Sequence, residues 1–141
     1  LGMGYTYGGH PVSCAVALET LKIYEERDIV GHVRQISPHF QSRLKDLGSS
    51  SIVGEARGVG LIGALEIVAD KSTREQYPPE LKTGAQLVAR ALAKGLIVRA
   101  LPGDVVGICP PLIITDEQID ELFDTLTLAV QETEQLLKKA A

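Results

Sequence analysis

A run of aliphatic residues and glycines at residues 52–68, IVGEARGVGLIGALEIV, decides the fold of this chain. Its valines and isoleucines favour strands, where branched side chains pack well on a pleated surface. Its glycines, Gly54, Gly58, Gly60 and Gly63, predict bulges, turns or the close approach of another backbone. The stretch therefore predicts two strands, or one long strand with a bend.

Part of this run, Gly58-Val59-Gly60-Leu61-Ile62-Gly63, matches the glycine fingerprint of dinucleotide-binding proteins letter for letter. The fingerprint works only between a strand and a helix, because the N-terminus of that helix holds the pyrophosphate. In this chain the apolar, strand-like pattern continues from Leu61 to Val68. We therefore interpret the glycines as a bend between strands and not as a nucleotide site.

Two helices are predicted before the strand region. Pro11 suits the first turn of a helix, where its missing N–H costs nothing, and apolar residues recur at helical spacing over residues 12–26. Asp28 suits the cap of a second helix that ends near Leu47. Pro38 lies inside this second helix and is expected to kink it or to break it.

A loop, a helix and a hairpin are predicted after the strand region. Residues 70–80 are polar and end in two prolines, which indicates a loop, and the pattern of residues 81–94 predicts a helix that stops at a glycine. Residues 96–101 and 105–109 flank Pro102-Gly103-Asp104, which predicts a hairpin with a short turn.

A last helix completes the chain. Thr115 and Gln118 form a capping-box pattern at its start. One apolar stripe follows it at helical spacing: Ile119, Leu122, Phe123, Leu126, Ala129, Val130, Thr133 and Leu137. The order of the elements predicts an α/β chain of the α+β kind, with a mostly antiparallel sheet and helices packed on one face.

Composition and charge limit the partners of the chain. Of its 141 residues, 45% are hydrophobic and 23% are charged, which is typical of one globular domain. The net charge of −4 provides no general attraction for nucleic acid. No apolar run approaches the ~20 residues that span a bilayer. We therefore expect neither nucleic acid nor a membrane as a partner.

The cysteines and histidines do not indicate a metal site. Cys14 and Cys109 are too few for a disulfide framework and suit a reducing, cytoplasmic location. His10, His32 and His39 show no ligand spacing with either cysteine, so we expect no bound metal. The sequence also lacks a nucleophile or acid–base motif of its own, and we expect no catalytic residue in it.

Three motifs carry a resemblance to a known family. The first is Gly4-Tyr5-Thr6-Tyr7-Gly8-Gly9-His10-Pro11, which runs into a helix rich in small residues. The second is Arg57-Gly58-Val59-Gly60-Leu61, continued by residues 65–71. The third joins Leu96-Ile97-Val98-Arg99-Ala100 to Gly103-Asp104 and Pro110-Pro111-Leu112. In this order and spacing they resemble the class III aminotransferases, and the third is similar to the omega-amino-acid and amine:pyruvate branch.

The resemblance implies roles for three residues. Thr6 and Tyr7 would bind the family's cofactor, pyridoxal 5′-phosphate, with Thr6 reaching the phosphate of the partner's cofactor across a homodimer. Arg99 would bind the carboxylate of the amino or keto acid through two parallel hydrogen bonds, and would swing aside for uncharged amines. By residue chemistry alone, Thr6 also suits a cap in a turn and Arg99 an exposed edge strand.

The resemblance also implies that the active-site residues come from two domains. The family's cofactor lysine and the acid partner of the pyridine nitrogen would belong to a large domain upstream of Leu1, since no lysine of this chain lies in a matching context. Residues 1–11 would then be a lead-in that contacts the cofactor phosphate, and residues 12–141 the C-terminal small domain. The complete enzyme would move an amino group from an amino acid or amine to a keto acid such as pyruvate, and this chain alone would be inactive. The rival interpretation is a non-catalytic α+β interaction or regulatory module.

Overall fold

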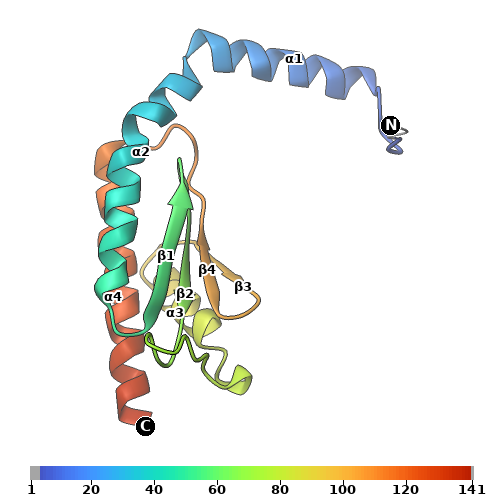
Figure 1. Ribbon diagram of the computed structural model, residues 1–141. Coiled ribbons are helices and arrows are strands. Elements are labelled where there is room, and N and C mark those ends of the chain that lie inside the picture. Colours follow the sequence, from blue (N-terminus) through green and yellow to red (C-terminus); the bar gives the residue numbers. More distant parts are fainter. Residues whose placement is uncertain (1–3, 141) are drawn as a thin grey trace.

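The computed structural model describes residues 4–140 of the chain. Its long helices are α1 (Pro11–Glu26), α2 (Ile29–Asp46), α3 (Thr83–Ala93) and α4 (Asp116–Ala140), and two short 3-10 helices, η1 and η2, lie at Leu47–Ser49 and Pro79–Leu81. Its strands are β1 (Val53–Val59), β2 (Ile62–Ile67), β3 (Arg99–Leu101) and β4 (Val105–Ile108). Figure 1 shows α2 and α4 side by side along the sheet, with α1 extending away from them.

The strands form one antiparallel sheet in the order β1-β2-β4-β3. The prediction of a mostly antiparallel sheet with helices on one face is therefore confirmed. β1 and β2 are joined at Gly60-Leu61, where Val59 pairs with Ile62 and Gly60 has φ +58°. A glycine with positive φ at the first central position is what a two-residue type II′ hairpin requires. A strand follows these glycines instead of a helix, which confirms that they form a bend.

A bulge interrupts the β1–β2 pairing near the start of β1. The register shifts between Val53 and Glu55, on either side of Gly54. A Cβ atom added to Gly54 would lie 2.7 Å from a methyl carbon of Val68, which is itself buried. Gly54 therefore lets the bent strand approach the end of β2, as the glycine pattern predicted.

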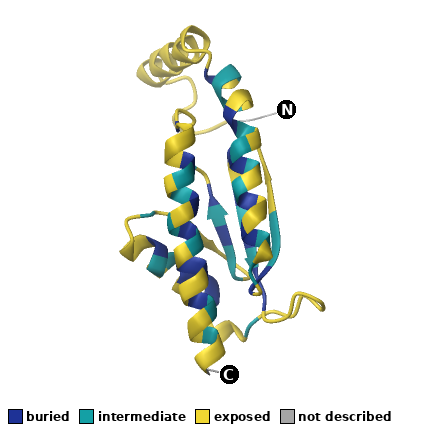
Figure 2. Ribbon diagram, turned by 90° about the vertical axis from the view of Figure 1, so that its left-hand side faces the viewer, coloured by how far each residue is buried: buried dark blue, intermediate teal, exposed yellow. Residues whose placement is uncertain are grey.

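The core lies between the sheet and helices α2, α3 and α4. Leu65 of β2 and Val106 of β4 are fully buried on the helix-facing side of the sheet. Phe40 of α2 meets Phe123 of α4 edge to face, with ring centroids 5.1 Å apart. The predicted stripe of α4 is buried or partly buried along its length, and Figure 2 shows it in dark blue and teal.

The predicted helix starts are confirmed. The Thr115 hydroxyl accepts the Gln118 N–H at 3.3 Å, and the Gln118 side-chain oxygen accepts the Thr115 N–H at 3.1 Å. The Asp28 carboxylate accepts the N–H of Gly31 at 3.2 Å at the start of α2. The break at Pro38 does not occur, because α2 runs unbroken from Ile29 to Asp46. Buried residues before and after the proline hold both halves of α2 on the core.

Helix α1 contributes nothing to this core. None of its residues is buried, and Figure 2 shows it exposed on all sides. Its apolar residues Val12, Val16, Leu18 and Leu21 are each more than 60% exposed. The helix therefore reaches away from the body of the chain and carries the lead-in residues at its far end (Figure 1).

Candidate functional site

The face of the sheet that the helices leave uncovered carries a row of residues that includes Arg99. Residues paired across neighbouring strands lie on the same face of a sheet. The strand register places four residues in one such row: Arg57, Ala64, Gly107 and Arg99. Leu65, the neighbour of Ala64, points into the core, so the row lies on the opposite side. We call this side the open face.

Arg99 has a free guanidinium group on the open face. The residue is exposed on the edge strand β3, and its side chain has no hydrogen bond or ion pair with any residue from 4 to 140. The residue opposite is Gly107, and the Leu101 side chain fills the place of its missing side chain, with a methyl carbon 3.1 Å from where a Cβ atom would lie. A free, exposed guanidinium can bind a carboxylate through two hydrogen bonds.

Arg57, at the other end of the same row, is already paired. Its Nη1 lies 2.8 Å from a carboxylate oxygen of Glu66 and 3.1 Å from one of Glu55. The two arginines therefore share a face and a row but differ in their partners. Of these two, Arg99 is the one available to an added carboxylate.

The lead-in forms turns rich in glycine. Gly8 donates its N–H to the carbonyl of Tyr5 at 2.9 Å, and Gly9 has φ +74°. The Thr6 hydroxyl has no hydrogen bond within residues 4–140, and Tyr7 is 79% exposed. The cap position of α1 is His10, and its side chain makes no capping bond. Thr6 is thus not the cap of α1.

This geometry fits a phosphate group. The first N–H groups of α1 have no side-chain cap, and the N-terminus of a helix attracts anions. A hydroxyl without a partner and a glycine with positive φ stand close by in sequence. The lead-in lies at the end of α1 that is far from the sheet (Figure 1), so the structure does not bring Thr6 and Tyr7 together with Arg99.

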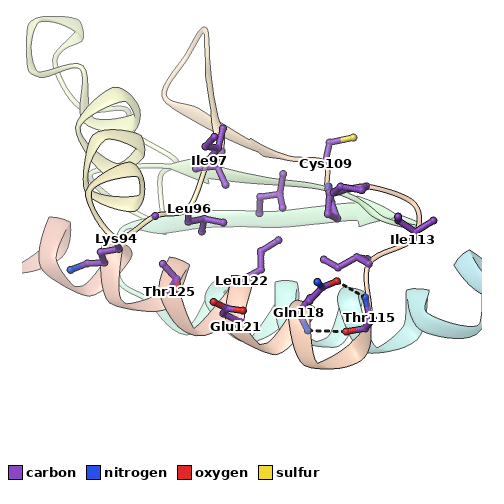
Figure 3. Close-up of a pocket in the computed structure, with 16 residues that line it drawn as sticks. Lys94, Leu96, Ile97, Cys109, Ile113, Thr115, Gln118, Glu121, Leu122 and Thr125 are labelled. Atoms are coloured by element: carbon purple, nitrogen blue, oxygen red, sulfur yellow. Dashed lines mark hydrogen bonds between the residues drawn. The ribbon is translucent and has the colours of Figure 1, made fainter.

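A pocket of about 600 Å³ opens between α4, the segment before β3 and the link from β4 to α4. Figure 3 shows that apolar side chains such as Leu96 and Leu122 project into it. Three of its polar side chains already have structural partners: Thr115 and Gln118 cap each other, and Lys94 pairs with Glu132 at 2.6 Å. None of the three predicted site residues lines this pocket.

The described residues form no group that could hold a metal, no disulfide and no helix that could span a membrane. Within residues 4–140, no group of three or more His, Cys, Asp or Glu side chains gathers as a metal site would. Cys14 and Cys109 are both free thiols on the surface. No helix in the same residues has the length and hydropathy of a membrane span.

One functional candidate was missed in the sequence. The carboxylate of Asp104, in the β3–β4 turn, accepts the N–H of Gly84 in the first turn of α3 at 2.9 Å. Gly103-Asp104 was noticed only as a turn and as part of a family motif. The two partners are 20 residues apart, and no local pattern reports such a contact.

The antiparallel sheet, with its layer of helices on one side and a free arginine on the other, defines a small α+β fold. The family model described as "Aminotransferase class-III" matches residues 1–130. The chain belongs to the class III aminotransferases.

Relatives and solved structures agree with this assignment. The chain is 46% identical over 136 residues to "Gamma aminobutyrate transaminase 1, mitochondrial" of Solanum lycopersicum, covering 96% of this chain and 26% of that protein. An omega-transferase from Vibrio fluvialis JS17 superposes with a TM-score of 0.91 at 35% identity, covering 100% of this chain and 33% of that one. The PMP-bound form of an aminotransferase from Vibrio fluvialis superposes with a TM-score of 0.87 at 36% identity, over 94% of this chain and 29% of that one. The chain therefore spans about a quarter to a third of the length of these proteins.

Proposed function

We propose that this chain is the C-terminal small domain of a pyridoxal-phosphate-dependent aminotransferase, which transfers an amino group from an amino acid or amine to a keto acid such as pyruvate. The observation that carries the proposal is the family match over residues 1–130. Residues 1–11 form the lead-in to the cofactor phosphate, and residues 12–141 form the small domain. The relatives named above include a gamma-aminobutyrate transaminase and an omega-transferase, which supports amino donors of this general class.

The cofactor role belongs to the lead-in. Bound pyridoxal phosphate would take the amino group from the donor and pass it to the keto acid. The Thr6 hydroxyl and the uncapped N–H groups of α1 would hold its phosphate, with Tyr7 beside them. A phosphate held there is far from Arg99 of the same chain, which agrees with a homodimer in which each lead-in serves the partner's cofactor.

The substrate role belongs to Arg99. Its free guanidinium on the open face would hold the carboxylate of an amino or keto acid. Arg99→Ala in the complete enzyme removes this contact, and the catalytic efficiency for carboxylate donors should fall roughly 30-fold to several thousand-fold. Neutral amines should lose much less, and Arg99→Lys should restore activity only in part, because an ammonium lacks the planar fork. Single-turnover kinetics of each half-reaction, with an amino acid and then a neutral amine, measure this difference.

Arg57→Ala provides the matched control. It removes an arginine from the same row of the same face, but one that Glu55 and Glu66 already hold. Its losses should be small and equal for both kinds of donor. Equal losses for both donors with Arg99→Ala would show that Arg99 is structural, and the carboxylate-binding role would then be abandoned.

The chain alone should be inactive. None of its lysines has the sequence context of the family's cofactor lysine. Incubation with pyridoxal phosphate and borohydride, followed by mass spectrometry, should therefore show no specific adduct. A stoichiometric adduct on one lysine would contradict the proposed division between two domains. An adduct-free chain whose complete protein also lacks transaminase activity would favour the rival, a non-catalytic interaction module.

Helix α1 supports the homodimer. Large exposed apolar side chains that gather on one helix mark a surface that binds protein. Leu18 and Leu21 are 69% and 61% exposed, so the large domain and the partner subunit would cover them in the complete enzyme. The chain alone should form dimers or larger species by sedimentation, and Leu18→Glu with Leu21→Glu should shift them toward monomer. A monomer at high concentration would count against this role of α1.

The location of the enzyme is a separate part of the proposal. Two exposed, unpaired cysteines suit the reducing cytoplasm. The tomato relative is named mitochondrial, so fractionation of cells carrying the tagged complete protein would decide between the two compartments.

A further inference from the structure

The turn of the β3–β4 hairpin is fastened to the first turn of α3. The Asp104 carboxylate accepts the N–H of Gly84 at 2.9 Å. The two backbones lie so close that a side chain at position 84 would be crowded. A Cβ atom on Gly84 would lie 3.0 Å from the Cα of Asp104 and 3.1 Å from its carbonyl carbon. Gly84 is buried beneath this contact. The hairpin turn and the start of α3 therefore form one tight junction.

Asp104 also joins the junction to the sheet. Its carbonyl oxygen accepts the N–H of Ile67, the last residue of β2, at 3.1 Å. Its backbone has φ +53°, and it follows Gly103, which has φ +77°. One residue thus connects the hairpin turn, α3 and the neighbouring strand, and does so in a backbone conformation that few residue types adopt readily.

Unusual features gather on the α3 side of the junction as well. Lys82 has φ +46° just before the helix. The hydroxyl of Thr83 is fully buried and has no hydrogen-bond partner in the part of the chain that the structure describes. Strained backbone and an unpaired buried hydroxyl persist only where the surroundings hold a segment in place, and they gather at functional sites. The junction is therefore a segment that the surrounding structure holds in one geometry, as is common at functional sites.

The element that this junction holds is the one that carries Arg99. β3 has three residues and pairs only with β4, through Arg99–Gly107, Ala100–Val106 and Leu101–Val105. Its end at Leu101 leads directly into the turn that Asp104 fastens. The position of the turn on α3 therefore sets where the edge strand lies.

We infer that Asp104 is a positioning residue: its carboxylate fixes the β3–β4 turn on α3 and thereby sets the place from which Arg99 meets a substrate carboxylate. The inference rests on the proposed role of Arg99. Asp104 does not touch the substrate itself, and its effect passes through the backbone of the hairpin.

Two substitutions in the complete enzyme separate the carboxylate contact from the turn conformation. Asp104→Gly keeps the positive φ and removes the acceptor of the Gly84 N–H. Asp104→Asn tolerates positive φ and keeps an oxygen that can accept this N–H. Asp104→Gly should raise KM for carboxylate donors by about 10-fold to 100-fold, as a misplaced positioning group does, with kcat for neutral amines nearly unchanged. Asp104→Asn should stay close to the unsubstituted enzyme for both donors.

A readout other than activity tests the same contact. Amide hydrogen exchange of the β3 and β4 residues should become faster in Asp104→Gly and stay unchanged in Asp104→Asn. Equal losses for both donors in Asp104→Gly, or unchanged kinetics and exchange, would overturn the inference.

Gly84→Ala covers the case in which Asp104→Gly folds poorly. Alanine is the better helix former, and its Cβ pushes on the Asp104 backbone while every hydrogen-bonding group remains. It should give the same donor-selective rise in KM, and equal losses for both donors would again overturn the inference.

Parallel measurements on Arg99→Ala separate this inference from the proposed function. If Arg99→Ala is selective for carboxylate donors and Asp104→Gly is not, only the inference fails. If Arg99→Ala shows no selectivity, the substrate role of Arg99 fails and the inference falls with it. With both correct, Asp104→Gly should add no further donor selectivity to Arg99→Ala.

Discussion

Helices α1 and α4 contain many apolar residues but use them in opposite ways. The apolar residues of α4 lie on one stripe, and Ile119, Phe123 and Leu126 are fully buried against the core. Those of α1 are spread around the helix, and none is buried. α4 therefore finds its packing partners within this chain, whereas α1 is not buried by any of the residues from 4 to 140. The difference separates a helix that belongs to the folded core from one that does not.

The difference also has an energetic side. Most of the stability of a helix in a protein comes from packing an apolar face, and an isolated helix of about 12–15 residues is marginal in water. α1 has 16 residues and no buried contact, while α4 is packed on α2 and α3. Substitutions in α4 and the sheet should therefore change the stability of this chain, and matched substitutions in α1 and the lead-in should not.

The largest contrast is expected between Phe123→Ala and Leu18→Ala. Phe123 is fully buried and packs edge to face on Phe40, so its truncation should cost about 3–5 kcal/mol. Leu18 is 69% exposed, and its truncation should change the free energy of unfolding by less than about 0.5 kcal/mol. Urea unfolding followed by circular dichroism measures both. The measurement is made at a protein concentration where the chain is monomeric, and a large loss with Leu18→Ala there would mean that α1 packs on the body of the chain.

A second contrast compares two glycines. Gly54→Ala forces a Cβ atom to within 2.7 Å of Val68 in the β1 bulge and should cost about 1–3 kcal/mol. A Cβ atom added at Gly4 has no atom within 4 Å, so Gly4→Ala should leave the free energy of unfolding unchanged. Unfolding midpoints under the same conditions give the comparison. A neutral Gly54→Ala would show that the bulge relaxes to accept a side chain.

A third contrast compares the starts of the two helices. Thr115→Ala removes one half of the capping box of α4 and should cost about 1 kcal/mol. His10 makes no side-chain capping bond at the start of α1, so His10→Ala should leave the thermal midpoint unchanged. Thermal unfolding measured by circular dichroism checks both. Equal shifts of the thermal midpoint would show that α1 contributes to the stability of the chain as much as α4 does.

The smallest effect concerns ion pairs and depends on pH. The Lys138 ammonium, with Ser51 and Ser50, lowers the pKa of Glu134 from 4.5 to about 2. Because this pKa is lowered in the folded chain, the stabilisation is complete above pH 4.5 and is lost as the pH falls toward 2. Glu134→Gln should therefore cost no more than about 1 kcal/mol at pH 7 and nothing near pH 2.

The control for this effect lies in α1. Glu26 faces Lys22 at 3.8 Å, and both side chains are about 60% exposed. Glu26→Gln should have no measurable effect at either pH, since exposed pairs contribute little. A Glu134→Gln effect that persists unchanged at pH 2 would exclude the carboxylate as its cause.

The sequence predicted the features of the fold that depend on nearby residues. The caps at Asp28 and at Thr115 with Gln118 act within four residues of the helix start, so their patterns were readable. The consequence of Pro38 was left open between a kink and a break, and buried residues on either side of it, Ile36 and Phe40, keep the helix continuous. The isolation of α1 was also not predictable from its own residues, since an apolar helix gives no sign of where its partner lies.

The candidate site was predictable only in part. Thr6, Tyr7 and Arg99 were found through a family resemblance, and their roles remain predictions. The structure adds that Arg99 is free while Arg57 is paired, a difference that depends on Glu66 of the neighbouring strand. The contact of Asp104 with Gly84 joins a turn to a helix start and has no local signature.

The short edge strand β3 has a consequence for the timing of catalysis. The junction of Asp104 with Gly84 holds the backbone of β3, so motion of the exposed Arg99 is motion of its side chain, and exposed side chains change rotamer in picoseconds to nanoseconds. Enzymes commonly turn over about 10 times per second, so in the proposed role the Arg99 side chain could meet and leave a substrate carboxylate many times in each cycle. Its choice between a carboxylate and solvent is then at equilibrium before the chemistry begins. An enzyme moved from an amino acid to a neutral amine should reach its new steady rate without a lag.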